Sequence, residues 1–430
     1  MRERFFDIAI VGTGPAGLAA ASEAVRAGRS VAVIDESPGV GGQVWRGSGG
    51  GEAARWRTKA EDATFLLGAA VYDAAPGRLL VNTPDGAVCV RAGAIVLATG
   101  ARELLLPFPG WTLPGVMGAG GVQSMVKSGM RVEGKRVVIA GSGPLLWAVA
   151  ATLRSRGADV LGIAEQAPGK AVRALAASLW RSPAKAVQAA TLAWQTRGVP
   201  KWTGSWPVRA EGLGRLERVT LSDGERTMTL ECDLLGVGFG LVPNTTLASL
   251  LGCRVQPAVV GGAVAVDAAM GTTVAGVYAA GEAVGIGGVD CAILEGRIAG
   301  LAAAGSGERA MALSPARVRA RAFAARLESA FTLRPEVLAL ADERTILCRC
   351  EDVPFGEVVG LGSWREAKVH TRCGMGPCQG RVCGSALAAI KGWTPNDARP
   401  PIVPVPVSVL MDQPAATAAD HPPKPDGAAV

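Results

Sequence analysis

The feature that most constrains this chain is a glycine-rich turn between a short apolar strand and a helix near its start. Residues 6–12 read FDIAIVG, a run typical of a buried parallel strand, and the helical pattern LAAASEAVRAG follows the turn. A second strand, SVAVIDE, completes a βαβ unit. The expected fold class is therefore α/β, with a Rossmann-like parallel sheet at its start.

The glycine spacing in this turn predicts a dinucleotide-binding site. Gly12 permits the tight turn, Gly14 lets a pyrophosphate approach the backbone, and Gly17 allows the helix to pack closely on the strand. Asp35 closes the second strand, where its carboxylate can accept hydrogen bonds from an adenosine ribose. A purely structural glycine turn is the weaker interpretation. The residues expected to bind the cofactor here are Gly12, Gly14, Pro15, Ala16, Gly17, Asp35 and Glu36.

A second βαβ pattern begins at residue 136 but departs from the glycine rule. Gly141 and Gly143 are followed by Leu146 at the third position, where leucine would push the helix from the strand or crowd a pyrophosphate. Glu165 ends the adjacent strand, and an acid there disfavours a 2′-phosphate. We expect a Rossmann-like shape. Bound NAD(P)H, another adenine nucleotide such as ATP, or no ligand remain alternatives.

Length and charge narrow the class further. With 430 residues, two or three domains are expected, and the net charge of +7 is scattered rather than gathered into a nucleic-acid face. Two histidines, His370 and His421, make histidine-based catalytic triads improbable. No apolar run is long enough for a membrane span, and a strand begins at once, so a cytoplasmic protein without a signal peptide is expected.

The nine cysteines are unevenly placed, which favours metal or cluster ligation over a disulfide framework. Cys348-x-Cys350 and Cys378-x4-Cys383 form two pairs, and four converging thiolates suit an iron–sulfur cluster or zinc. Zinc sites more often use C-x2-C spacing. Cys373 is a fifth candidate, and glycines before Cys378 would let backbone N–H groups turn toward the sulfurs. The isolated cysteines are Cys89, Cys232, Cys253 and Cys291.

Three further segments resemble the two-dinucleotide-binding-domain flavoproteins. AIVLATGARE (94–103) is similar to the strand and turn that cross the flavin dinucleotide, and TTVAGVYAAGEAVGIGG (272–288) to the segment whose acid meets the ribityl or phosphate region. GGQVWR (41–46) resembles the loop that covers the flavin. The resemblance implies FAD, a split FAD domain and an inserted second nucleotide domain. It adds as cofactor-binding residues Gly42, Gln43, Arg46, Thr99, Gly100, Ala101, Gly281 and Glu282.

The cysteine segment, CRCE…TRCGMGPCQGRVC, resembles the bacterioferritin-associated-ferredoxin-like [2Fe–2S] domain, which is small and α-rich. That resemblance implies a [2Fe–2S] cluster and matches its ligands to four cysteines, leaving Cys373 out. The implied ligands are Cys348, Cys350, Cys378 and Cys383. The predicted domains are a split FAD domain (1–120 and 262–335), an inserted domain (121–261), a [2Fe–2S] domain (340–393) and an extended or disordered tail (394–430).

Nearly the whole chain, from residue 5 to about 410, resembles the flavin/iron–sulfur subunit of heteromeric amine dehydrogenases. These include octopine and nopaline oxidases, hydroxyproline dehydrogenases and hydrogen cyanide synthase; the landmarks here are GGQVWR, GSGPLLWAVA and LVPNTTLASLLGC. Leu146 follows this subfamily. The resemblance implies that a partner similar to D-amino-acid oxidase oxidises the substrate C–N bond, that a small [2Fe–2S] subunit joins in some complexes, and that this chain relays electrons.

Two alternatives to this function stay open. One is a self-contained NAD(P)H-dependent flavin/iron–sulfur reductase, and the other is a cluster-bearing scaffold whose flavin is only structural. No catalytic residue stands out: the absence of a cysteine pair near the first helix argues against thioredoxin-reductase chemistry. Arg46, Arg102 and Glu103 could lie near the flavin ring, although salt-bridge or surface positions are the default expectation.

One segment of the predicted inserted domain is a candidate partner surface. Residues 171–230 are expected to form a helix followed by two strands, with a hairpin turn at Asp223-Gly224. An exposed apolar face for partners could lie in the region 176–206, which is rich in tryptophan. Core packing explains the same side chains as well or better. The tryptophans concerned are Trp180, Trp194, Trp202 and Trp206.

Overall fold

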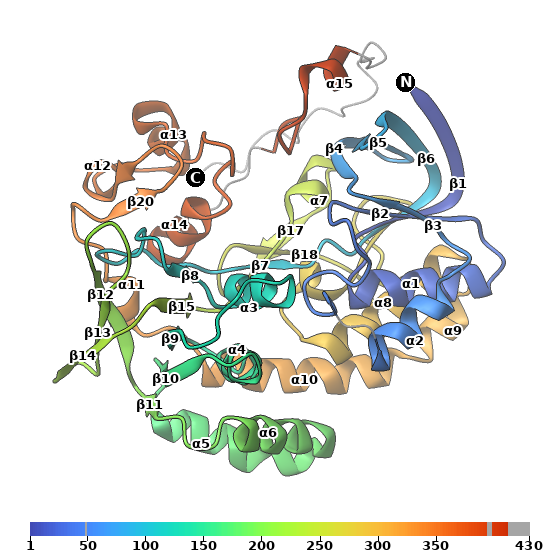
Figure 1. Cartoon of the computed structure of the whole chain (residues 1–430). Coiled ribbons are helices and arrows are strands. Elements are labelled where there is room, and N and C mark those ends of the chain that lie inside the picture. The colour runs from blue at the N-terminus through green and yellow to red at the C-terminus, as the bar shows by residue number, and fades with distance from the viewer. Residues whose placement is uncertain (48–49, 394–397, 412–430) are drawn as a thin grey trace. The chain divides into compact units, whose positions relative to one another are not determined.

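The computed structural model describes residues 1–47, 50–393 and 398–411, and the chain packs into two compact units (Figure 1). Unit 1 comprises Met1–Ala101, Pro243–Arg321 and Asn396–Val430, and unit 2 comprises Arg102–Val242 and Ala322–Pro395. The expected α/β fold class is confirmed. The second unit interrupts the first along the chain, but the division into four functional domains stays a prediction.

Unit 1 is built on a seven-stranded sheet in which the first strand lies near the centre. The strand order is β3-β2-β1-β6-β5-β4, and β19 pairs with the C-terminal end of β6. The pairings of β1 with β2 and with β6 are parallel, as the predicted βαβ unit requires. The strands are β1 (Arg2–Val11), β2 (Val31–Asp35), β3 (Thr64–Leu67), β4 (Ala70–Ala75), β5 (Arg78–Thr83), β6 (Gly86–Leu97) and β19 (Val277–Ala279).

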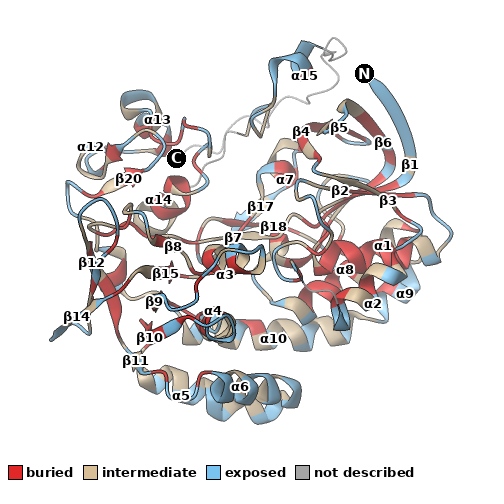
Figure 2. Cartoon of the chain, in the orientation of Figure 1, coloured by how far each residue is buried: buried red, intermediate tan, exposed pale blue. Residues whose placement is uncertain are grey.

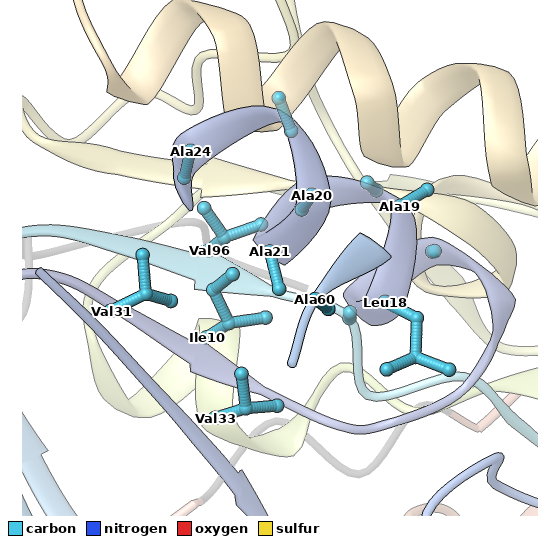
Figure 3. Packing of buried hydrophobic residues seen from close by; sticks show 14 of the residues in the cluster. Ile10, Leu18, Ala19, Ala20, Ala21, Ala24, Val31, Val33, Ala60 and Val96 are labelled. Atoms are coloured by element: carbon cyan, nitrogen blue, oxygen red, sulfur yellow. The ribbon is translucent and has the colours of Figure 1, made fainter. Parts of the chain in front are cut away.

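Two helices of unit 1, α1 and α8, pack together because glycines let their backbones approach. A Cβ added at Gly296 would lie 2.1 Å from the carbonyl oxygen of Ala16, and one at Gly300 would lie 2.3 Å from that of Ala20. The alanines and Leu18 of α1 cover the apolar face formed by β1, β2 and β6 (Figure 3). The helices of unit 1 are α1 (Pro15–Arg26), α2 (Gly51–Lys59), α7 (Thr246–Leu250), α8 (Val289–Ala303), α9 (Gly307–Met311) and α15 (Val407–Met411).

Unit 2 contains the second Rossmann-like sheet, which is parallel throughout. The order is β11-β10-β9-β15-β8, with β8 (Val116–Gly118), β9 (Arg136–Gly141), β10 (Asp159–Glu165), β11 (Lys201–Thr203) and β15 (Leu234–Gly238). The helices beside it are α3 (Ala119–Lys127), α4 (Leu145–Ser155), α5 (Gly169–Ser178) and α6 (Pro183–Gln195), with a 3-10 turn, η1 (Leu179–Arg181), between the last two. A three-stranded sheet follows, formed by β12 (Trp206–Glu211), β13 (Arg218–Ser222) and β14 (Thr227–Glu231).

Two expectations about unit 2 need correction. Leu146 does not push its helix away, because its side chain is only 1% exposed and packs into the core with Ile139 and Val149. Residues 171–230 form two helices and four strands rather than one helix and two strands. The hairpin at Asp223-Gly224 is confirmed, since β13 and β14 pair antiparallel around it.

The C-terminal part of unit 2 is small and largely helical, as the fold prediction has it. Its elements are β20 (Ile346–Cys348), β21 (Val353–Pro354), α11 (Pro335–Leu338), α12 (Gly356–Val359), α13 (Trp364–Thr371) and α14 (Cys383–Lys391). The long helix α10 (Ser314–Ala330) begins in unit 1 and ends in unit 2. Of the predicted tail, residues 394–397 and 412–430 lie outside the described residues. Residues 398–411 include α15, and Val409 packs in unit 1 beside Tyr72 and Leu80.

The close approach of α1 and α8 makes a direct prediction about stability. We expect Gly300→Ala to lower the melting temperature, since a methyl group 2.3 Å from a carbonyl oxygen must move α8 off α1. Overpacking of this kind costs about 1–3 kcal/mol. Ala303→Ser, a small change at a half-buried position of the same helix, is the control. Equal melting temperatures for the two variants would contradict the packing argument.

Candidate functional site

The Gly12–Gly17 turn offers both space and donors for a pyrophosphate. Gly12 has φ +112°, and a Cβ there would lie 2.2 Å from the carbonyl oxygen of Ala98, so glycine is required. A Cβ at Gly14 would meet nothing within 4 Å, and α1 begins directly after it with no side-chain cap. Uncapped N–H groups at the positive end of α1, beside an open position, fit a bound phosphate.

Asp35 lies at the end of β2 and is bonded to the turn. Its Oδ2 accepts hydrogen bonds from the amide of Thr13 at 2.6 Å and from its hydroxyl at 2.7 Å, and Oδ1 accepts one from the amide of Ser37 at 2.8 Å. Oδ1 keeps one acceptor position to spare, so a ribose hydroxyl can still be bound there. The neighbouring Glu36 is exposed.

The GGQVWR segment lies against the same turn. The amide of Gly41 donates to the carbonyl oxygen of Thr13 at 3.1 Å, and a Cβ at Gly42 would lie 2.9 Å from the Cα of Gly14. Trp45 is buried behind it, and the Arg46 guanidinium donates to the Ser37 hydroxyl at 3.3 Å. The structure therefore brings this loop to the mouth of the phosphate position, where Gln43 is exposed.

The turn after β6, at residues 98–101, lies beside the first glycine turn, since Ala98 is the residue that Gly12 approaches. The Thr99 hydroxyl donates to the carbonyl oxygen of Asn244 at 2.7 Å, and the Asn244 side-chain amide donates back to the Thr99 carbonyl at 2.9 Å. The Asn244 backbone amide also donates to the carbonyl oxygen of Gly100. Sequence reasoning missed Asn244, although it lies in the landmark LVPNTTLASLLGC. It holds the Thr99–Ala101 turn where the chain leaves unit 1.

The loop of residues 281–288 closes the site over the start of α1. Gly281 has φ +73°, and a Cβ there would lie 2.8 Å from that of Ala16. The Glu282 carboxylate accepts hydrogen bonds from the amides of Gly287 and Gly288, each at 2.8 Å. Burial raises the pKa of Glu282 in spite of these bonds. Glu282 therefore shapes its own loop as well as facing the predicted cofactor region.

A buried ion cluster supports that loop and was not predicted. Glu295 of α8 is 0% exposed, and its carboxylate binds Arg317 at 2.9 Å and Arg321 at 2.7 Å, both from α10. The same carboxylate accepts a hydrogen bond from the amide of Gly281 at 3.2 Å, and Arg321 donates to the carbonyl oxygen of Gly285 at 2.9 Å. The signal in the sequence is weak: two arginines four residues apart on a charged helix, and an acid in the middle of a largely apolar helix.

The second glycine turn, in unit 2, has its acid turned inward. The Glu165 carboxylate accepts hydrogen bonds from the amide of Gly143 at 2.7 Å and from that of Ala167 at 2.8 Å. Burial raises the pKa of Glu165 to about 7, although these N–H groups oppose the shift. Gly141 has φ +136° and approaches Gly238, so this turn has the same build as the first. The open position at Gly143 suits a phosphate, but the Glu165 carboxylate is buried, which leaves a ribose hydroxyl little access to it.

Residues 331–334 cross over this second turn. The Ser142 hydroxyl donates to the carbonyl oxygen of Phe331 at 3.2 Å, and the Gln166 side-chain amide donates to that of Thr332 at 3.2 Å. The amide of Arg334 donates back to the Gln166 side-chain oxygen at 3.1 Å. The chain itself therefore binds the polar groups beside the turn.

Arg102 and Glu103 take positions inside unit 2. Arg102 donates to the carbonyl oxygen of Arg381 at 3.0 Å and to the Ser385 hydroxyl at 2.9 Å. Burial lowers its pKa to about 10. The Glu103 carboxylate accepts hydrogen bonds from the amides of Gly120 and Gly121 at the start of α3, and burial raises its pKa. Both side chains are half-buried.

The five clustered cysteines come together in the C-terminal part of unit 2. The sulfurs of Cys348, Cys373 and Cys383 all lie within 4.8 Å of one another and are buried. Cys350 and Cys378, which are more exposed, contact each other through their thiols. The Gly374 amide donates to the Cys348 sulfur, as the glycine-rich sequence predicts. Soft thiolates in this number fit an iron–sulfur cluster or zinc.

The remaining cysteines do not form a redox pair within the described residues. All four are buried and free, and they lie in separate parts of the fold. Cys291 comes closest to the flavin region, under the 281–288 loop, but burial raises its pKa to about 12 and keeps it a thiol.

The fold and these loops define a flavoprotein oxidoreductase of the Rossmann type. Residues 6–301 match the pyridine nucleotide-disulphide oxidoreductase family, and the chain belongs to that family. It is 33% identical to an opine oxidase subunit of Rhizobium meliloti (strain 1021) over 454 residues, covering 95% of this chain and 98% of that one. It is also 32% identical to the hydrogen cyanide synthase subunit HcnB of Pseudomonas aeruginosa, covering 87% and 90% of the two chains.

Solved structures agree with this fold. L-proline dehydrogenase from P. horikoshii superposes with a TM-score of 0.64, covering 95% of this chain and 80% of the other, at 20% identity. The predicted resemblance to polypeptides of multi-subunit oxidases is confirmed by the two relatives named above. In the part of the chain that the structure describes, no helix has both the length and the apolar character to cross a bilayer.

Glu165 predicts a pH dependence of stability. Its pKa is raised from 4.5 to about 7 on folding, so the native state binds the proton more tightly than the unfolded state. That stabilisation is complete below about pH 4.5 and is lost as the pH rises through 7. The loss amounts to up to about 3 kcal/mol. Denaturant unfolding of wild type and Glu165→Gln across this range is the test, and the variant's profile should be flatter. Parallel profiles would contradict the assignment.

Proposed function

We propose that this chain is the FAD- and [2Fe–2S]-containing electron-transfer subunit of a heteromeric amino-acid or opine dehydrogenase. It would act in the cytoplasm and relay electrons from a substrate C–N bond, oxidised on a partner polypeptide similar to D-amino-acid oxidase, to an acceptor. A small [2Fe–2S] subunit would join the complex. The observation that carries the proposal is the combination of a flavin-type site lacking a redox cysteine pair, within the described residues, with five converging thiols.

The flavin half of the proposal rests on the convergence of the predicted loops in unit 1. Asp35 would bind the ribose, the uncapped start of α1 the pyrophosphate, and the 281–288 loop the ribityl region. FAD takes up two electrons at once, and an iron–sulfur cluster passes single electrons onward. The iron–sulfur half of the proposal rests on four cysteines as ligands, with Cys373 buried beside them. These ligands are Cys348, Cys350, Cys378 and Cys383.

A second candidate, an NADH-dependent reductase, is favoured by one observation. The position at Gly143 is open, and α4 begins with no side-chain cap, as a nucleotide phosphate requires. Against it stand the buried Glu165, which already binds Gly143, and the chain segment bonded to Ser142. A nicotinamide cofactor would have to displace these contacts.

An anaerobic reduction experiment separates the candidates. We expect the visible spectrum of the purified chain to stay oxidised when NADH and then NADPH are added, because the acid of the second turn is occupied. Photoreduction is the control: light-driven electrons should bleach the flavin and then give a reduced-cluster signal by electron paramagnetic resonance. Rapid bleaching by NADH would establish the reductase instead. A flavin that light cannot reduce, with no cluster signal, would leave only a structural scaffold.

The proposed cluster ligands can be tested one thiol at a time. Cys383→Ser should abolish the visible absorption of the cluster and its iron content, because a ligand is lost. Cys373→Ser should keep the iron and change only the spectrum, because the family resemblance leaves Cys373 out of the ligand set although its thiol lies within 4.8 Å of those of Cys348 and Cys383. Cys253→Ser, at another buried cysteine, is the matched control. Loss of iron in Cys373→Ser with retention in Cys350→Ser would overturn this ligand set.

A further inference from the structure

The two helices α5 and α6 form an unusual part of unit 2, because neither contains a buried residue. Among the residues of α5, η1 and α6, not one is buried, and Figure 2 shows this hairpin in pale blue and tan. Every other described helix of ten residues or more places at least one residue in the core. The hairpin therefore contributes little to folding, and its exposed surface needs another explanation.

One side of α6 is nevertheless anchored to the unit. Lys185 lies over the Phe323 ring of α10 at 5.9 Å, and Arg326 of α10 donates to the Ser182 hydroxyl at 3.3 Å. At the far end, Arg154 of α4 donates to the carbonyl oxygens of Gln195 and Arg197 at 2.9 and 2.7 Å. The opposite side of α6 is therefore held facing solvent in a fixed orientation.

That outward side is apolar and carries tryptophan. Val187, Ala190, Thr191 and Trp194 follow one another at the i, i+3, i+4, i+7 spacing of a single helical face, and all are exposed. Val187 is 68% exposed and Trp194 64%, while Trp180 in the turn between the helices is 73% exposed. The expectation of core packing holds for Trp206, which is 3% exposed, and is wrong for Trp180 and Trp194.

The charge of the hairpin has one sign only. Residues 169–201 contain six Lys or Arg and no Asp or Glu, and the acid-free stretch extends from Gln166 to Ala210. Two of the arginines stack on the exposed tryptophans: Arg181 lies 5.1 Å from the Trp180 ring and Arg197 lies 5.0 Å from the Trp194 ring. Each exposed indole is thus paired with a cation.

We propose that the α5–α6 hairpin docks this protein onto an anionic phospholipid surface. Tryptophan rings prefer the headgroup level of a bilayer, and the stacked arginines would meet lipid phosphates. Exposed tryptophan with cations beside the rings is a feature of helices that lie in the interface plane. A protein partner is the less suitable occupant, because the outer face presents small side chains between the tryptophans and no acid to pair with a mixed-charge surface.

The test uses the full chain and vesicles. We expect sedimentation with vesicles of phosphatidylcholine and phosphatidylglycerol, little with phosphatidylcholine alone, and release at high salt. Trp180→Ala with Trp194→Ala should weaken binding at least about 10-fold, and Arg181→Glu with Arg197→Glu by a similar factor. Brominated lipids should quench part of the tryptophan fluorescence of wild type, and that quenching should be lost in Trp180→Phe with Trp194→Phe.

Controls within the same unit make the result specific. Leu213→Ala with Arg215→Glu changes an exposed apolar residue and an exposed cation in a different loop and should leave binding unchanged. Unaltered flavin absorption and circular dichroism should show that all variants fold. The proposal is overturned if the protein ignores anionic vesicles, if the hairpin and control variants bind alike, or if only a protein partner is bound.

Discussion

The flavin half of this molecule depends on one buried carboxylate, Glu295. It has no contact with solvent, and it binds two arginines of α10 and the backbone of the loop that begins at Gly281. A buried charge left without partners is strongly destabilising, by about 3–5 kcal/mol, so these groups must stay together. The cluster links a helix in the apolar core, a charged helix and a cofactor loop. Arg321 extends the link to Gly285.

The two glycine turns share a local geometry, but their acids differ in how accessible they are to a ligand. Both first glycines have positive φ and approach a neighbouring strand end too closely for a side chain. In the first turn the acid, Asp35, is half-buried and can still accept a ribose hydroxyl. In the second, Glu165 is buried and bonded to Gly143 itself. The difference lies in the burial of the acid, and Leu146 packs into the core of its unit.

The parts of this structure that the sequence predicts are those governed by local rules. The glycine turn, the parallel strands and the hairpin at Asp223-Gly224 follow from spacing and periodicity, and the structure confirms them. Clustering identifies the cysteine segment, but the position of Cys373 beside Cys348 and Cys383 emerges only in the folded chain. Contacts between residues far apart in sequence, such as Thr99 with Asn244, leave no periodic signal. The outward face of α6 has the same composition as a core face, so only burial could separate the two interpretations.

The predicted chemistry is divided between the two units. All the loops expected to contact FAD belong to unit 1, whereas the five thiols and the exposed hairpin belong to unit 2. The chain passes between units 1 and 2 at residues 101–102, 242–243, 321–322 and 395–396. Next to the first three of these points lie the Thr99–Asn244 bonds and Arg321 with its tie to Glu295. The groups that shape the Thr99–Ala101 turn and the 281–288 loop thus lie close in the sequence to the points where the chain leaves unit 1.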